Sequence, residues 1–283
     1  MVRFGAHAFV WSGEWTTEIG NQTIQKAARV GFDFIEIPLL RPATFDAKVH
    51  KETLAAEGIQ AVCSLALPKD AHMPEHPQAA REFLILALDK VSELGCNYLG
   101  GCTAYALGAL TGKPPTEEEY QTVVEGMRVI SDEAKERGIT LALEACNRYE
   151  THLFNTLGDT RAKIKEIGAQ NLKLHADTYH MNIEEEGFYD PIINTADILD
   201  YIHMSESHRG LVGTGTVLWD QVWRGLKDSN FSGSLVLESF AAINPDIAAA
   251  TCLWRPTPYS ADKLASEGLA FLKRGVSEYN LNA

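Results

Sequence analysis

The sequence is short of positive charge. Its 283 residues include 25 Lys and Arg against 38 Asp and Glu, so the formal net charge is −13 when His is neutral. Proteins that bind duplex nucleic acid need a basic surface to displace counterions from the phosphates. A protein attracted to an anionic membrane surface has the same need. The composition therefore argues against both nucleic acid and membrane as partners.

Long apolar runs and paired cysteines are also missing. No apolar run approaches the roughly 18 residues of a membrane-spanning helix, and the first residues lack the apolar core of a secretory signal. Disulfide frameworks and cysteine-rich zinc sites favour paired spacings. The cysteines here are odd in number and form no C-x-x-C pair: Cys63, Cys96, Cys102, Cys146 and Cys252. We therefore expect a cytoplasmic protein with reduced, mostly buried thiols.

The sequence lacks a dinucleotide-binding fingerprint and an interdomain linker. The first predicted strand continues into Phe9-Val10-Trp11-Ser12-Gly13, where a doubly wound sheet usually carries G-x-G-x-x-G. No Ser/Pro-rich or low-complexity stretch divides the chain. We therefore expect one domain over residues 1–283.

What the sequence does contain is a repeated junction. A charged amphipathic stretch ends in Gly and an apolar, β-rich run follows, as around Gly31, Gly58, Gly95, Gly138 and Gly168. Glycine adopts the left-handed conformation that ends many helices. Short apolar runs are typical of strands with both faces buried in a parallel sheet. Each junction therefore predicts the end of a helix and the start of a strand.

Counting these units predicts the fold. Eight units in 283 residues are about 35 residues each, which fits an α/β protein of the (β/α)₈ TIM barrel class. The predicted strands lie at 3–10, 33–38, 59–67, 97–103, 139–145, 171–177, 200–205 and 234–239. The predicted helices lie at 20–30, 46–57, 78–94, 117–137, 157–167, 190–199, 219–228 and 260–277.

Polar residues stand at the carboxyl ends of consecutive predicted strands, where such barrels carry their active sites. These residues are Glu144, Asp177, His203 and Glu238, and the second strand also ends in an acid, Glu36. Clustered carboxylates without a cation would repel one another and raise their pKa values. A divalent metal resolves that repulsion; a purely structural ion-pair network is the alternative. One imidazole and three carboxylates suit Mn(II), Co(II) or Mg(II) better than thiolate-preferring ions.

Four segments together resemble the ketose 3-epimerase family. Residues 143–150 (LEACNRYE) resemble its LEVVNRFE motif, and residues 177–185 (DTYHMNIEE) resemble DTFHMNIEE. Residues 203–215 resemble HxGESHRGxxGTG, and residues 238–240 resemble ESF or EPF. The family includes D-tagatose, D-psicose (D-allulose) and L-ribulose 3-epimerases of the xylose isomerase-like barrels. The resemblance extends along nearly the whole chain.

The resemblance implies roles for individual residues. Glu144, Asp177, His203 and Glu238 match the metal ligands, and Glu144 with Glu238 match the acid/base pair. The residues that match sugar contacts are Glu150, His180 and Arg209 at the keto end, and His7, Trp15 and Phe240 at the distal end. The resemblance also implies a homodimer or homotetramer.

The chemistry of these groups agrees with epimerisation at carbon 3 of a free ketose. A metal would act as a Lewis acid toward a cis-enediolate, while Glu144 and Glu238, three strands apart, could remove and deliver the proton on opposite faces. Alternatives on the same barrel are an aldose–ketose or hydroxypyruvate-type isomerase and an endonuclease IV-like phosphodiesterase. The acidic charge argues against the phosphodiesterase. A non-catalytic sugar-binding protein would not need two acids beside the metal.

Two further segments and one residue near the strand ends lead to structural predictions. The Gly-rich residues 210–215 follow the seventh strand, where barrels often bind phosphate, but no Lys follows them, so we expect a shaped turn. Ser205 replaces a family Gly on the face of His203, so it should narrow the pocket or add a hydroxyl contact. Residues 105–116 show no clear match and are expected to shape specificity.

Overall fold

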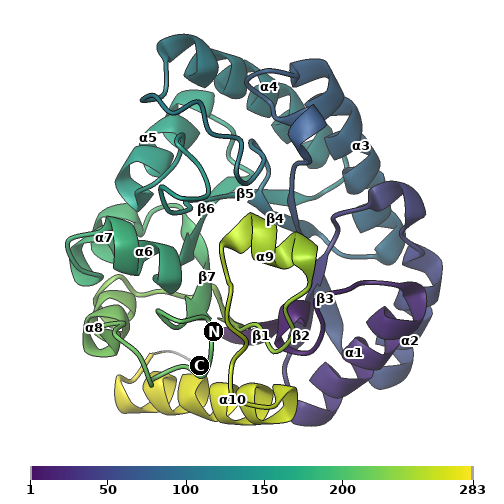
Figure 1. The fold of residues 1–283 in the computed structure, drawn as a ribbon, viewed down its shortest axis with the longest axis vertical. Coiled ribbons are helices and arrows are strands. Elements are labelled where there is room, and N and C mark those ends of the chain that lie inside the picture. The colour runs from purple at the N-terminus through teal and green to yellow at the C-terminus, as the bar shows by residue number, and fades with distance from the viewer. Residues whose placement is uncertain (1, 282–283) are drawn as a thin grey trace.

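In a computed structural model that describes residues 2–281, eight parallel strands close into a barrel. Each strand pairs with the next one along the chain, and β8 pairs with β1 (Figure 1). The strands are β1 (Arg3–His7), β2 (Phe34–Pro38), β3 (Gln60–Ala66), β4 (Tyr98–Cys102), β5 (Thr140–Glu144), β6 (Leu172–Asp177), β7 (Leu199–Ser205) and β8 (Ser234–Glu238). The prediction of a (β/α)₈ barrel is confirmed.

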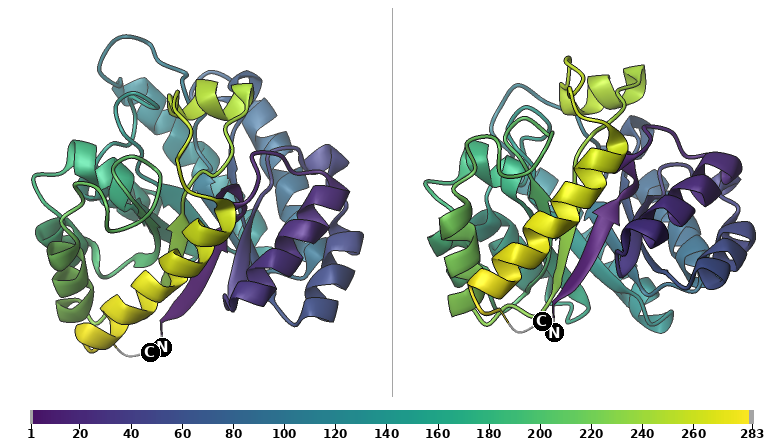
Figure 2. Two further views of the ribbon diagram at one scale, coloured as in Figure 1. Left: turned by 60° about the horizontal axis from the view of Figure 1, so that its bottom comes forward. Right: turned by 90° about the horizontal axis from the view of Figure 1, so that it is seen from below.

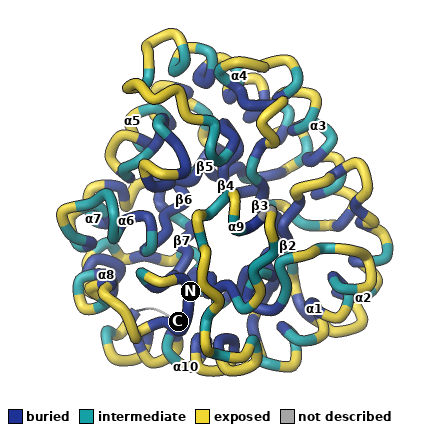
Figure 3. The backbone as a smooth tube through the Cα atoms, viewed as in Figure 1, coloured by how far each residue is buried: buried dark blue, intermediate teal, exposed yellow. Residues whose placement is uncertain are grey.

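Helices surround the barrel and bury its outer face. Figure 3 shows buried strands at the centre and exposed turns around the outside. The helices are α1 (Thr17–Val30), α2 (Ala47–Glu57), α3 (Pro77–Leu94), α4 (Glu117–Glu136), α5 (Leu157–Ile167), α6 (Thr178–Glu184), α7 (Tyr189–Thr195), α8 (Trp219–Asp228), α9 (Pro245–Thr251) and α10 (Ala261–Glu278).

Four of the five glycines at the predicted junctions cap helices, and the fifth, Gly138, follows the Arg137 cap of α4 with φ +67°. Gly31, Gly58, Gly95 and Gly168 have φ values of +94°, +66°, +86° and +79°, and each is the C-cap of its helix. A residue with a Cβ would be strained in this left-handed conformation. These residues therefore stop the helices and turn the chain back toward the next strand.

Two short helices, α6 and α9, were not predicted. α6 begins directly after β6, because the Asp177 carboxylate accepts a hydrogen bond of 2.7 Å from the Tyr179 backbone N–H. Asn244 caps α9 in the same way, at 2.8 Å from the Ile247 N–H. Figure 1 shows α9 across the barrel opening, and Figure 2 shows it at the end opposite the start of β1. α9 therefore covers the end where the strands finish.

The barrel interior changes character along its axis. Near the start of the strands it is filled by a separate buried cluster of Phe34, Val62, Tyr201 and Val236, with Tyr98 packed against it. Side chains alternate along a strand, so the next inward position on β2 after Phe34 is Glu36, and on β7 after Tyr201 it is His203. The polar residues thus lie above an apolar layer.

The predicted domain of residues 1–283 includes Met1 and residues 282–283, which lie outside the described part of the chain. Within residues 2–281 the strands and helices form one barrel. No helix in this part of the chain is long and apolar enough to cross a membrane.

Candidate active site

The four predicted metal ligands meet at the carboxyl end of the barrel. The sheet register places Asp177 beside His203, and Glu238 beside the residue two positions after His203. His203 Nδ1 lies 3.7 Å from Glu144 Oε1 and 3.6 Å from Glu238 Oε1. Ligand atoms of Asp177, His203 and Glu238 lie within 4.8 Å of one another. All four residues are buried, so the strand ends do bring this oxygen-rich set together.

A carboxylate below the cluster fixes the orientation of His203. Glu36 Oε2 lies 2.8 Å from His203 Nε2, and the Tyr201 hydroxyl donates a hydrogen bond of 2.5 Å to the same oxygen. Although burial opposes ionisation, His203 and His7 hold the pKa of Glu36 well below its ordinary value. A carboxylate on one ring nitrogen is the common support of a metal-binding His, because it leaves the other nitrogen free to bind.

The free nitrogen of His203 is the observation that favours a metal ion. Nδ1 is buried and has no hydrogen-bond partner among the described residues, yet carboxylate oxygens of Glu144 and Glu238 face it. Buried polar atoms are rarely left unsatisfied. Burial disfavours a charged ring, but Glu36 and Glu238 outweigh it and raise the pKa of His203 well above its ordinary value. Surroundings that attract a proton this strongly also attract a divalent cation.

His175 is a second buried histidine beside the cluster, and sequence reasoning missed it. Its ring lies edge-on to that of His203 with centroids 4.2 Å apart, and its Nδ1 lies 3.7 Å from Glu144 Oε2. Burial lowers the pKa of His175 well below its ordinary value, so the ring is neutral. The signal was present in the sequence, because His175 stands two residues before Asp177 and therefore on the same face of β6.

Arg209 enters the cluster from the loop after β7. Its Nη1 donates to Asp177 Oδ2 at 2.7 Å and also to Glu238 Oε2. The guanidinium lies 3.8 Å from the centroid of the Tyr179 ring and 5.2 Å from that of Phe240. Burial opposes its charge, but Glu238 and Asp177 raise the pKa of Arg209 further, so it stays protonated. The guanidinium is therefore held between two carboxylates and two aromatic faces.

His180 and Glu150 face the same cavity and share one hydrogen-bond partner. The backbone N–H of Asn147 donates to His180 Nδ1 at 3.1 Å, and its side-chain amide donates to Glu150 at 2.8 Å. Burial lowers the pKa of His180 to about 3 and raises that of Glu150 to about 7. The Nε2 atom of this neutral ring lies 3.6 Å from Asp177 Oδ2 and 3.2 Å from Arg209 Nη2. His180 lies in α6.

The site opens into a cavity of about 720 Å³. The predicted distal contacts all line it, together with residues of α9: His7, Trp15, Phe240, Pro245, Ile247, Ala250 and Thr251. Trp15 donates from Nε1 to His50 at 3.1 Å, so its indole is held against the wall. Burial lowers the pKa of His7 to about 4, so this ring is neutral. The cavity falls in the usual size range for small-molecule sites.

The Glu206 carboxylate binds backbone donors in and beside the Gly-rich loop after β7. The N–H groups of Ser207, Gly213 and Val217 donate to the Glu206 carboxylate at 2.9, 2.8 and 3.2 Å. A carboxylate of the chain itself thus occupies the position that an anion would need. The loop is a shaped turn.

The structure also shows what Ser205 and the segment 105–116 contact. Ser205 is fully buried, and its hydroxyl accepts a hydrogen bond of 3.3 Å from Arg209, so the added hydroxyl contacts the guanidinium. In the segment 105–116, Leu107 lines the cavity, and the Tyr105 hydroxyl donates to the backbone oxygen of Glu144 at 2.8 Å. This segment therefore helps to support the end of β5.

Known proteins resemble this chain over nearly its whole length. Residues 24–275 match the xylose isomerase-like TIM barrel family. An L-ribulose 3-epimerase of Methylomonas sp. (strain DH-1) is 36% identical over 279 residues, which cover 96% of this chain and 97% of that protein. A ketose 3-epimerase of Arthrobacter globiformis is 34% identical, with 96% of each protein covered.

Solved structures agree with the sequence matches. The crystal structure of D-allulose 3-epimerase from Methylomonas sp. in complex with D-allulose superposes with a TM-score of 0.93 at 36% identity, covering 96% of each chain. An L-ribulose 3-epimerase structure superposes equally well, with a TM-score of 0.93 at 30% identity, covering 99% of this chain and 96% of that one. The chain belongs to the ketose 3-epimerase family of xylose isomerase-like TIM barrels.

Proposed function

We propose that this protein is a metal-dependent epimerase that inverts carbon 3 of a free ketose. The observation that carries the proposal is the placement of Glu144 and Glu238, whose Oε1 atoms lie 3.7 and 3.6 Å from His203 Nδ1 in one cavity. Inversion beside a ketone needs a base on one face of the carbon and an acid on the other. Two carboxylates from β5 and β8, three strands apart around the barrel, are suited to this pair of roles.

We assign the metal to Glu144, Asp177, His203 and Glu238. Mn(II) or Co(II) suits this set best and Mg(II) is acceptable, because three of the four ligands are carboxylates. When bound, the ion supplies positive charge that stabilises the negative charge developing beside the ketone. Glu36 supports His203, so that Nδ1 faces the ion.

Each remaining residue positions the sugar or moves a proton. In one direction Glu238 removes the carbon-3 proton and Glu144 delivers a proton to the opposite face; in the reverse direction the two exchange roles. Arg209 donates to oxygens at the keto end, His180 binds there through Nε2, and Glu150 accepts from a hydroxyl. Each well-placed acid or base contributes about 10²–10⁴-fold to the rate.

The distal end of the ketose would lie against His7, Trp15 and Phe240. Their rings offer faces to C–H groups, and residues of α9 line the same cavity. The substrate is an unphosphorylated sugar of the D-tagatose, D-fructose/D-psicose or L-ribulose type, because the Glu206 carboxylate already accepts from Gly213 of the Gly-rich loop and from Ser207 and Val217 on either side of it.

We also propose a homodimer or homotetramer in the cytoplasm. Apolar side chains are exposed on the loops at the carboxyl end of the barrel: Leu40, Leu110, Tyr149 and Trp254, at 44, 48, 63 and 72% exposure. Exposed apolar side chains of this size are available to pack against another chain. The five cysteines are free thiols, which suits a reducing compartment. Light scattering of the purified protein tests the assembly.

Product analysis tests the activity. The metal-free protein is reloaded with Mn(II), Co(II) or Mg(II) and incubated with D-fructose, D-tagatose and L-ribulose, and the sugars are separated by chromatography. We expect the carbon-3 epimer of at least one ketose, with Mn(II) or Co(II) giving the highest rate. Aldoses as products would instead show a carbon-1 to carbon-2 isomerase, and no product from any ketose would contradict both.

A further inference from the structure

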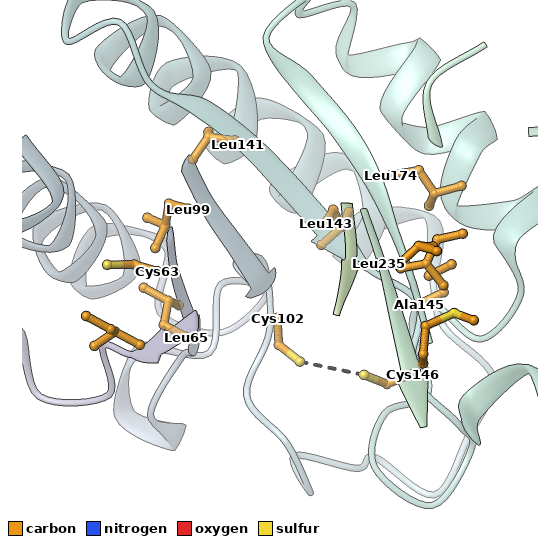
Figure 4. Close-up of a cluster of buried hydrophobic side chains, with 14 of the residues drawn as sticks. Cys63, Leu65, Leu99, Cys102, Leu141, Leu143, Ala145, Cys146, Leu174 and Leu235 are labelled. Atoms are coloured by element: carbon orange, nitrogen blue, oxygen red, sulfur yellow. Dashed lines mark hydrogen bonds between the residues drawn. The ribbon is translucent and has the colours of Figure 1, made fainter. Parts of the chain in front are cut away.

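Two thiols stand in the wall of the cavity beside the carboxylate cluster. Cys102 ends β4 and Cys146 follows Glu144 by two residues, and their Sγ atoms lie 3.7 Å apart (Figure 4). Both are buried, at 4 and 1% exposure, and both line the cavity. The catalytic roles proposed above use neither thiol. In the family motif that residues 143–150 resemble, the position of Cys146 is a valine, so the thiol is a departure from that motif.

The backbone fixes both thiols in place. Gly101 has φ +90°, and a Cβ there would meet the backbone oxygen of Leu65 at 2.4 Å, so glycine is required just before Cys102. The Cys146 N–H donates to the Phe154 oxygen at 2.9 Å, and its own oxygen accepts from Asn155 at 2.8 Å. The separation of the sulfur atoms is therefore set by two anchored strand ends.

That separation fits a bound metal better than a disulfide. Two sulfurs at about 2.3 Å from a tetrahedral ion stand about 3.8 Å apart, whereas a disulfide brings them to about 2.05 Å. A third ligand is present, because a carboxylate oxygen of Glu144 lies within 4.8 Å of both Sγ atoms. We propose that Cys102, Cys146 and Glu144 form a second metal site, which takes a thiophilic divalent ion such as Zn²⁺ or Cd²⁺.

Binding at this site affects the first site. As the two metal–sulfur bonds form, the two thiol protons pass to solvent. Glu144 belongs to both ligand sets, so an ion held by the thiols withdraws this carboxylate from the oxygen-rich set and from proton transfer. Thiophilic ions should therefore inhibit the enzyme. The inhibition rests on the proposed function, whereas the binding does not.

A second pair of cysteines provides an internal control. Cys63 and Cys96 also have Sγ atoms 3.7 Å apart, and Cys96 donates to the Val91 oxygen at 3.6 Å. Neither belongs to a group of three ligand side chains within residues 2–281, whereas Cys102 and Cys146 do. Equal spacing without the carboxylate should not create a metal site.

Cadmium titration of the Mn(II)-loaded full-length protein tests the binding. All variants are made in a background protein that carries Cys252→Ser, because Cys252 is an exposed thiol that could bind cadmium on its own. The thiolate-to-cadmium charge-transfer absorption should rise and saturate at one ion per chain. It should persist in Cys63→Val and disappear in Cys146→Val and in Cys102→Val. Circular dichroism identifies any variant that fails to fold. Absorption retained in both cavity variants, or lost in folded Cys63→Val, would overturn the site.

Epimerase rates in the same titration test the shared ligand, each protein being compared with its own cadmium-free rate. The background protein should lose activity over the cadmium range in which the absorption rises. Cys146→Val should need at least about tenfold more cadmium, because it removes one of the two thiolate ligands, and loss of even an outer-shell support costs about 10–100-fold in affinity. Absorption without inhibition would overturn the sharing of Glu144. Absorption in a protein with no epimerase activity would contradict the proposed function and leave the thiol site standing.

Discussion

The two ends of the barrel interior are filled by different kinds of side chain. At the end where the strands begin, Phe34, Val62, Tyr98, Tyr201 and Val236 fill the space with rings and branched chains. At the end where they finish, buried carboxylates, imidazoles and a guanidinium face one another. Four of the residues with a buried polar atom that has no hydrogen-bond partner in the described structure lie there: Glu36, His175, His203 and Arg209.

The apolar end of the barrel interior contributes to stability, whereas the polar end serves function. Rings in an apolar layer stabilise the barrel by leaving water, and they need no partner. Buried polar groups without partners cost stability, and such groups concentrate where a protein binds or reacts. Tyr201 connects the two ends, because its ring packs in the lower cluster and its hydroxyl donates to Glu36. The end of the barrel where the strands begin, here called the lower end, therefore supports the polar side chains at the upper end, where the strands finish.

The largest expected effect is at the upper end. Glu238→Gln removes the group that exchanges a proton with carbon 3, so we expect kcat to fall by about 10²–10⁴-fold under saturating Mn(II). Glu267→Gln, which removes an exposed partner of Lys263 on α10, is the matched control and should leave kcat unchanged. Steady-state rates measure both variants, and full activity of Glu238→Gln would contradict its role.

A substitution at the lower end should change stability and leave the catalytic rate nearly unchanged. Phe34→Ala empties a fully buried position, and we expect the free energy of unfolding to fall by about 3–5 kcal/mol. Because the ring lies below the Glu36 layer, kcat of the folded protein should change little. Urea unfolding measures the first quantity, and Phe34→Leu should lose less. A large drop in kcat with unchanged stability would show that the two ends are not separate in function.

Glu36→Gln tests the connection between the ends. The amide is uncharged, so its oxygen accepts from the Tyr201 hydroxyl and His203 Nε2–H more weakly than the carboxylate does, and His203 is held less firmly. We expect affinity for Mn(II) to fall by about 10–100-fold, measured by calorimetry on metal-free protein. Tyr201→Phe removes only one donor to Glu36 and should weaken binding less. Unchanged affinity in Glu36→Gln would remove this carboxylate from the support of the metal.

The smallest effect concerns pH at the lower end. Burial raises the pKa of Asp200 from its ordinary value of 3.8 to about 6, and its carboxylate accepts from Tyr98. The folded state thus binds this proton more tightly than the unfolded state, so stability falls as pH rises from about 4 to about 6 and the cost persists above. Asp200→Asn should be more stable at pH 7 by about 1–2 kcal/mol, since water screens a half-buried group. Equal stability at pH 7 would contradict the burial cost.

The sequence predicted what depends on repeated local patterns. Glycine-ended helices followed by apolar runs recur along the chain, so all eight strands could be located. The short helices α6 and α9 have seven residues each, too few for an amphipathic repeat, and their caps were the remaining signal. Reading strand ends found the upper polar layer but assigned no role to Glu36 and missed His175, because their roles depend on contacts across the barrel.

One measurement tests the central claim, that Glu144 and Glu238 act on opposite faces of carbon 3. Glu144→Gln and Glu238→Gln are incubated in deuterium oxide with each epimer of the accepted ketose, and deuterium at carbon 3 is followed by NMR after removal of the metal. Each variant keeps one carboxylate, so each should exchange the proton of one epimer, a different epimer in each variant, without converting it. Exchange of the same epimer by both variants, or deuterium at carbon 1, would contradict the account.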